Sequence, residues 1–185
     1  MDRDAGPARY HRAVHTRQVE PGDAAALLEI YNPEVTQEAV SFDIYERTLE
    51  DQVAWIEEHR GPHPAIVAVG DDAALGSVGA SGEPILGFAS VSPFRERAAY
   101  ATTVEDSVYV HREARGKGIG LLLLEDLLVV ARHAGFHSVI GRIVGHNETS
   151  IRLHARCGFE LVGVEREVGR KHGRWLDVVE MQRLL

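Results

Sequence analysis

Apolar residues along the chain follow two periods, and each period predicts one kind of element. Alternation of apolar and polar residues is typical of a strand with one buried face, and a short continuous apolar run is typical of a strand buried on both faces. The segments with one of these patterns, which we predict as strands, are 14–19, 65–69, 85–91, 104–110, 138–144, 159–168 and 175–181. The stretch His172-Gly173-Arg174 separates the last two and predicts a hairpin.

Apolar residues that recur three and four positions apart predict the helices. The predicted helices cover 24–31, 49–60, 121–133 and 148–157. Pro33 is expected to end the first helix, because proline has no backbone N–H to donate. Thr48 and Asp51 have the spacing of a capping box at the start of the second. Gly135 and Gly158 are expected to close the last two as left-handed C-caps.

The order of these elements predicts an α/β fold, a mixed sheet with helices on its faces. A chain of 185 residues fits a single domain, which we place at 13–185. Residues 1–12 are charged, small or proline-bearing and predict a disordered tail. The tract 70–84, rich in Gly, Ser, Ala and Asp, predicts a long surface loop between two strands.

A glycine-rich loop joins the strand at 104–110 to the helix at 121–133. Its sequence is Arg115-Gly116-Lys117-Gly118-Ile119-Gly120. Glycines let a ligand approach the backbone, and free N–H groups at a helix N-terminus attract anions, so the loop predicts a pyrophosphate cradle. A nucleotide P-loop is excluded because Gly118 stands where a Ser or Thr must follow the lysine, and the glycine spacing differs from the dinucleotide fingerprint. The alternative is an ordinary strand-to-helix turn.

Charge and cysteine content exclude several classes of function. The 28 acidic and 20 basic residues give a formal net charge of −8, which disfavours nucleic acid as the main partner because phosphate binding needs a basic face. The single cysteine, Cys157, rules out an internal disulfide, and no Cys or His spacing matches a zinc site. No signal peptide or membrane-spanning segment is predicted, so we expect a cytoplasmic protein without a metal.

Several motifs carry a resemblance to a known family. The glycine-rich loop resembles the acyl-CoA signature of the GNAT N-acetyltransferase superfamily, and residues 147–159 resemble its second signature, N-x-x-[AS]-x-x-L-[YH]-x-x-x-G-[FY]. Segments 93–100, 103–110 and 171–177 resemble the phosphinothricin and methionine sulfoximine N-acetyltransferases. The likeness begins near residue 14 and reaches the C-terminus. It implies the GNAT fold, with a mixed, mostly antiparallel central sheet and helices on both faces.

The resemblance implies acetyl-CoA as the cosubstrate and no metal. The backbone of the strand before the loop would pair with the pantetheine arm, and the loop would hold the pyrophosphate. Asn147 would bond the pantetheine, although a helix cap alone would explain an asparagine there. The implied set is Val108, Tyr109, Val110, Arg115, Gly116, Lys117, Gly118, Ile119, Gly120, Leu121, Asn147 and Arg156. For the basic residues, a solvated surface position is the alternative.

Glu105 and His154 are the predicted catalytic residues. N-acetylation needs a base that takes a proton from the attacking amine, and a cleft position raises the pKa of a carboxyl toward the working pH. Alternation places Glu105 on one strand face with Ser107 and Tyr109. The resemblance assigns the base to this glutamate, whereas the residues alone favour a solvated carboxylate. His154 stands where much of the superfamily has a tyrosine assigned as acid toward the thiolate, and a packed or surface histidine is the alternative.

The resemblance also implies a site for the amine substrate. Arg95 and Arg97 lie in the family's substrate loop, and a guanidinium group matches an amino-acid carboxylate with two parallel hydrogen bonds. The other implied substrate contacts are Glu96, Asp106, Ser107 and Phe42, with Trp175 as a further wall. For each of them a solvated loop residue is the alternative.

These observations predict direct transfer of acetyl from acetyl-CoA to the α-amine of a small amino acid or analogue, of the phosphinothricin or methionine sulfoximine type. Cys157 lies one residue before a helix C-cap, which disfavours a covalent acyl-cysteine. The alternatives are a GNAT enzyme that acetylates a protein N-terminus or an amine antibiotic, and an acyl-CoA sensor without turnover. The resemblance further implies a homodimer in which the partner's terminal hairpin, around 171–175, completes the substrate site.

Overall fold

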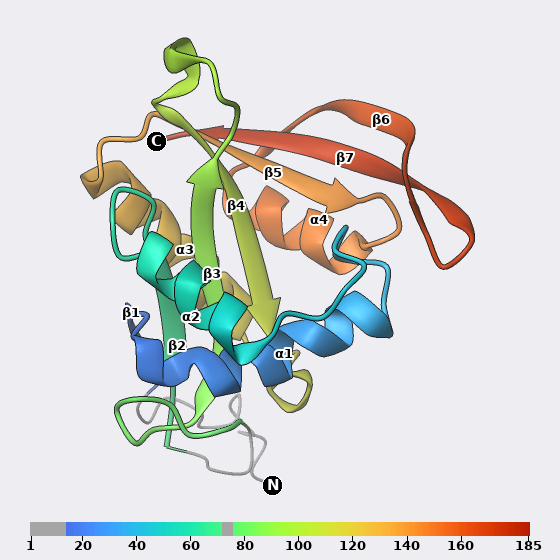
Figure 1. Ribbon diagram of the computed structural model, residues 1–185. Helices are drawn as coiled ribbons and strands as arrows, with labels where there is room; N and C mark the ends of the chain where they lie inside the picture. The colour runs from blue at the N-terminus through green and yellow to red at the C-terminus, as the bar shows by residue number, and fades with distance from the viewer. Residues whose placement is uncertain (1–13, 72–75) are drawn as a thin grey trace, which may run out of the picture.

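The computed structural model describes residues 14–71 and 76–185 as a seven-stranded sheet with helices on both faces (Figure 1). The predicted disordered tail, 1–12, lies outside the described residues. Strand order in the sheet is β1-β2-β3-β4-β5-β7-β6. Every neighbouring pair is antiparallel except β4 and β5, which are parallel. The predicted mixed, mostly antiparallel sheet is therefore confirmed.

Each predicted strand is present, and several are longer than the pattern indicated. The strands are β1 (His15–Gln18), β2 (Ala65–Val69), β3 (Ile85–Pro93), β4 (Thr103–Val110), β5 (Ser138–Val144), β6 (Glu160–Lys171) and β7 (Arg174–Leu184). The largest extensions are in β6 and β7, which form the predicted hairpin at the C-terminus. Because β7 inserts between β5 and β6, the last strand in the sequence is not an edge strand.

The four helices are α1 (Ala24–Thr36), α2 (Leu49–Glu58), α3 (Ile119–His133) and α4 (Glu148–Arg156). The prediction that Pro33 ends the first helix is wrong, since α1 continues to Thr36. Val35, beyond the proline, is buried in the core, and its burial compensates for the missing hydrogen bond. The capping box of Thr48 and Asp51 is confirmed in α2.

Two apolar cores lie on opposite faces of the sheet. On one face, α1 and α2 cover β1 to β4, with Leu27, Ile56 and Phe88 fully buried. On the other face, α3 and α4 pack against the sheet, with Leu123 and Leu127 at the centre of the core. The apolar stripe of each helix therefore sets the face that it covers.

Strands β4 and β5 pair over only part of their length. Their parallel register begins at Thr103 and Ser138 and ends at Asp106 and Gly141. Beyond this point β4 continues to Val110 while β5 turns away from it, so the two strands diverge (Figure 1). The divergence exposes one edge of β4 in the middle of the sheet.

Two long-range contacts tie loops to the fold. In loop 70–84, of which 72–75 lie outside the described residues, the backbone N–H of Ala80 donates to Asp23 at 2.8 Å. At the tip of the β6–β7 hairpin, the buried Lys171 ammonium donates to the carbonyl oxygen of Ser41, between α1 and α2, at 2.7 Å. In the described parts of the chain, no helix has the length and apolar character needed to span a membrane.

Candidate active site

Strand β4 presents its side chains alternately to the two faces of the sheet. Glu105 and Ser107 lie on the face that α1 and α2 partly cover, paired across the sheet with Ser92 and Ser90 of β3. Asp106 lies on the opposite face, beside α4. Alternation therefore predicted the face of Glu105 correctly.

Glu105 sits in an environment that favours its protonated form. Its side chain is partly buried, and this burial raises the pKa of the carboxyl above its ordinary value. The Arg142 guanidinium opposes the shift, while Asp106, Glu180 and Glu165 add to it. A carboxyl with a raised pKa is suited to take up and release a proton during catalysis.

Arg142 of β5 is a functional candidate that the sequence analysis missed. Register places it on the Glu105 face, because Glu105 pairs with Ile140 and side chains two residues apart share a face. Its guanidinium forms an ion pair with Glu165 of β6. A charged residue inside an otherwise apolar strand pattern was the signal that could have identified it.

His154 and Asp106 form a buried pair on the other face of β4. Nε2 of His154 lies 3.0 Å from Oδ2 of Asp106, and the side chains are 4% and 1% exposed. Nδ1 of the ring lies 2.8 Å from the carbonyl oxygen of Ser150. Asp106, expected to contact the substrate, is thus enclosed by protein on the face away from Glu105, which corrects that expectation.

The glycine-rich loop leads into α3 with two residues in the left-handed region. Gly116 has φ of 74° and Gly118, the N-cap of α3, has φ of 85°. A Cβ added at either position would meet no atom within 4 Å, and no side chain caps the helix. The backbone around the start of α3 therefore faces open space, as an anion cradle requires.

The third glycine of the loop has a different role. A Cβ at Gly120 would lie 3.3 Å from Leu153 of α4 and 3.6 Å from Val110 of β4. Gly120 therefore allows α3 to pack closely against α4 and β4. Its absent side chain serves packing within the protein, and not the open approach found at Gly116 and Gly118.

The predicted basic residues of the loop are engaged with protein groups. Lys117 donates to the carbonyl oxygen of Glu113 at 2.8 Å, and Arg115 pairs with the buried Glu34 at 2.7 Å. Asn147 caps α4 by accepting from the N–H of Ser150. An anion in the cradle would therefore meet backbone N–H groups first.

The remaining predicted substrate residues lie apart from one another. Arg95 stacks over Phe94 of the exposed loop that precedes β4, with its guanidinium carbon 4.7 Å from the ring centroid. Arg97 and Glu96 are exposed in the same loop. Phe42, in contrast, contacts the C-terminal hairpin, where a Cβ at Gly169 would overlap its ring. The loop before β4 and the hairpin thus border the Glu105 face from different sides.

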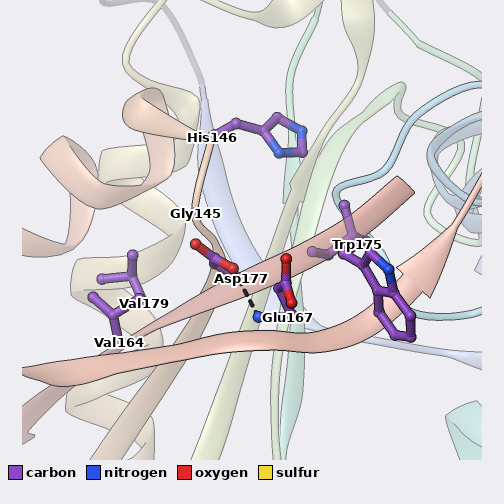
Figure 2. A pocket seen from close by; sticks show the side chains of 8 residues that line it. Gly145, His146, Val164, Glu167, Trp175, Asp177 and Val179 are labelled. Carbon is purple, nitrogen blue, oxygen red and sulfur yellow. Dashed lines mark hydrogen bonds between the residues drawn. The ribbon is translucent and has the colours of Figure 1, made fainter.

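A pocket of about 510 Å³ lies at the end of β5, against the C-terminal hairpin (Figure 2). Figure 2 shows His146, Glu167, Trp175 and Asp177 around it, with the Glu167 N–H donating to Asp177. Of the residues predicted for the site, Trp175 alone lines this pocket. The pocket is therefore separate from Glu105 and from the glycine-rich loop. Within the described residues, no cluster of His, Cys, Asp and Glu could hold a metal ion.

Comparison with known proteins agrees with the fold. The acetyltransferase (GNAT) family model matches residues 25–159. The chain is 40% identical over 171 residues to a phosphinothricin N-acetyltransferase from Streptomyces coelicolor, covering 91% of this chain and 96% of the relative. It is 38% identical over 167 residues to an L-methionine sulfoximine/L-methionine sulfone acetyltransferase from Pseudomonas paraeruginosa, covering 90% and 91%. The crystal structure of a GNAT phosphinothricin acetyltransferase from Sinorhizobium meliloti, in complex with acetyl-CoA, superposes with a TM-score of 0.83 at 36% identity, covering 93% of this chain and 88% of that one.

Proposed function

Because the chain belongs to the GNAT acetyltransferase family, and is therefore an N-acetyltransferase that uses acetyl-CoA, we propose that it acetylates the α-amine of a small amino acid or analogue of the phosphinothricin or methionine sulfoximine kind. The observation that carries this proposal is the partly buried Glu105 beside the diverging edge of β4. The two relatives named for such acceptors support the substrate class.

Acetyl-CoA fits the space that β4 and the glycine-rich loop leave free. It supplies an acetyl group activated as a thioester. The edge of β4 from Ser107 to Val110 has no strand partner on the β5 side and offers backbone groups to an extended pantetheine arm, although the Val110 carbonyl oxygen already accepts from Nε of Arg115 at 3.2 Å. The open backbone at Gly116 and Gly118 offers N–H groups to a pyrophosphate.

Glu105 is the proposed base. It takes a proton from the ammonium group of the acceptor, directly or through a water, so that a neutral amine can attack. Arg142 of β5 lies on this face, and Arg95 and Arg97 lie in the loop that leads from β3 to β4. A guanidinium group matches an acceptor carboxylate. Covalent transfer through Cys157 is disfavoured, because burial raises the pKa of its thiol to about 11.

A steady-state screen tests the proposed substrate class. Free thiol is measured while acetyl-CoA is offered with amino acids, with phosphinothricin, with methionine sulfoximine and with peptides that carry a free N-terminus. We expect turnover with the amino acids and analogues, and a large increase in KM when the acceptor carboxylate is converted to an amide. Turnover with the peptides alone would replace this proposal with that of a protein N-terminal acetyltransferase.

Gly118→Ala is expected to weaken acetyl-CoA binding. Alanine disfavours the left-handed backbone at Gly118 by roughly 1–2 kcal/mol, so the loop leaves the cradle conformation and KM for acetyl-CoA rises on the order of 10-fold. Gly135→Ala is the matched control. Gly135 also has a left-handed φ, of 91°, and an open Cβ position, but it lies at the other end of α3. Equal KM values in the two variants would remove the cradle assignment.

We also propose a homodimer formed through the C-terminal hairpin. Apolar side chains stand exposed along β6, the edge strand, and at the start of β7: Leu161, Val162, Val164, Val168 and Trp175. A second copy of the chain would cover them. Lys171 is buried against its own chain, so a partner would meet Trp175 and not Lys171.

Sedimentation velocity tests the dimer. We expect a dimer at micromolar concentration, and a monomer when Val164→Glu places a charge on the exposed side of β6. A fully active wild-type monomer at the same concentration would contradict the proposal that the partner completes the site.

A further inference from the structure

The buried pair of Asp106 and His154 has no role on the acceptor face. It lies on the opposite side of β4 from Glu105, with a distance of 3.0 Å between Nε2 and Oδ2. Phe159 packs edge-on against the His154 ring and helps to enclose it. An acceptor beside Glu105 therefore cannot touch either member of the pair.

The hydrogen bonds of the His154 ring fix the number of protons that the pair holds. Nδ1 lies 2.8 Å from the carbonyl oxygen of Ser150, and because a carbonyl only accepts, Nδ1 carries a hydrogen. Nε2 faces a carboxylate oxygen of Asp106, so a second hydrogen lies between those two atoms. The pair thus holds one proton more than a neutral imidazole and a carboxylate together, and its net charge is zero.

The pair lies where β4 and β5 separate. Asp106 and Gly141 form the last rung of the parallel ladder, and the ring lies against this rung. A Cβ at Gly141 would come within 2.8 Å of the ring carbon Cδ2 and 3.3 Å of Asp106 Oδ1, so glycine is required there. The ring is therefore held at the point from which the free edge of β4 begins.

One atom of the pair lacks a partner. Asp106 Oδ1 is buried, and no described residue forms a hydrogen bond with it. Leaving a buried carboxylate oxygen unpaired costs free energy, so this atom calls for an explanation other than packing. Packing alone would be served better by an apolar residue at position 106.

We propose that Asp106 is a positioning residue that acts through His154: it fixes the ring where β4 and β5 separate and keeps on it the proton that the leaving sulfur takes. This inference rests on the acetyl transfer proposed above. The amine nitrogen forms its bond to the acetyl carbon and the carbon–sulfur bond breaks. The sulfur keeps the bonding electron pair and takes the proton held between Nε2 of His154 and Oδ2 of Asp106, and the charge of the Asp106–His154 pair becomes −1 until solvent returns a proton. The acceptor loses two protons through Glu105 to solvent, so one net proton is released per turnover.

The charges around the pair support retention of its proton. Burial would lower the pKa of His154, but the Asp106 carboxylate and the Ser150 carbonyl outweigh it and raise the pKa above its ordinary value. The charge of Asp106 also raises the pKa of two other groups: Glu105, on the far face of β4, and Cys157, the residue that follows α4. On β5 the neighbour is Gly141, which carries no charge. Removing the charge of Asp106 leaves burial as the main influence on the ring.

Asp106→Asn tests the proposal with two independent readouts. In the free protein, NMR titration of the His154 ring is expected to show a lower pKa than in the wild type. In steady state, kcat is expected to fall on the order of 10²-fold with little change in KM for acetyl-CoA. The alkaline limb of the kcat profile is expected to move to lower pH, because the acid form exists only below the pKa of the ring.

Two further variants separate positioning from a structural effect. Asp126→Asn, which makes the same change in a carboxylate of α3 that accepts from Thr16, should alter neither readout. Asp106→Asn combined with His154→Gln should lose no more kcat than His154→Gln alone, because Asp106 acts through the ring.

Several results would overturn the inference. The first is a pKa of His154 in the wild type at or below the ordinary value of 6.5. The second is an Asp106→Asn enzyme that keeps the wild-type kcat and alkaline limb. The third is a double variant in which the kcat losses of the two single variants multiply. Failure to acetylate any amine would instead refute the proposed function, and the titration would still decide whether Asp106 holds the proton on the ring.

Discussion

Glu105→Gln is expected to lower kcat by roughly 10²- to 10⁴-fold while leaving KM for acetyl-CoA nearly unchanged. Glutamine keeps the shape of the side chain but cannot accept the proton of the acceptor. The wild-type pH profile of kcat/KM should rise through an acidic limb above the ordinary value of 4.5, because burial raises the pKa of Glu105 and a base acts only when ionised. That limb should be absent in the variant.

Glu180→Gln is the matched control for this experiment. Glu180 lies on the same face of the sheet, and its charge contributes to the raised pKa of Glu105. Its removal should therefore move the acidic limb to lower pH and keep kcat close to wild type. A folded Glu105→Gln enzyme with wild-type kcat and an intact acidic limb would show that another group, or water, is the base.

Asp23→Ala is expected to destabilise the fold by about 3–5 kcal/mol, as does breaking other buried ion pairs. The Asp23 side chain is fully buried and accepts two hydrogen bonds from Arg17, both at 2.8 Å. It also accepts the backbone N–H groups of Glu20 and Ala80. One carboxylate thus joins β1, the start of α1 and loop 70–84, and its loss should appear as a lower urea midpoint with an unchanged slope.

The stabilisation by Asp23 should depend on pH. Burial would raise its pKa, but the hydrogen bonds from Arg17, Ala80 and Glu20 outweigh burial and lower the pKa below the ordinary value of 3.8. A depressed pKa gives stability that is present above the unfolded-state value and is lost as pH falls through the folded-state value. The difference in free energy of unfolding between the wild type and Asp23→Asn should therefore become smaller below about pH 4. Asp51→Asn changes an exposed carboxylate that caps α2, and it should lower the free energy of unfolding at neutral pH by much less.

Local patterns predicted the elements of this fold because the signals for them are local. The capping box at Thr48 and Asp51 and the left-handed Gly135 and Gly158 are decided by neighbouring residues, and the structure has each of them. The end of α1 was predicted wrongly because burial of Val35, a tertiary effect, outweighs the local preference of Pro33. The lengths of β6 and β7 also depend on their pairing with each other and with β5.

The site was predictable only in part, for a related reason. Alternation alone fixes the face of Glu105, and the glycines alone mark the open loop. Asp106, the partner of His154, lies 48 residues earlier in the sequence, and no local pattern indicates that the two residues meet. Arg142 likewise joins the Glu105 face only through the register of two parallel strands. Contacts of this kind arise from the topology of the sheet. The family resemblance predicted that topology but not the side-chain contacts within it.

The place of β7 between β5 and β6 has a consequence for synthesis on the ribosome. The nascent chain emerges from its N-terminus, so β1 to β5 can pair while β5 still offers a bare outer edge. The strand that covers this edge, Arg174–Leu184, follows all the other strands of the sheet in the sequence and therefore emerges after them. Until then the exposed edge is a template for pairing with another nascent chain. A chain truncated before Arg174 would thus lack an interior strand, and it should be prone to aggregation.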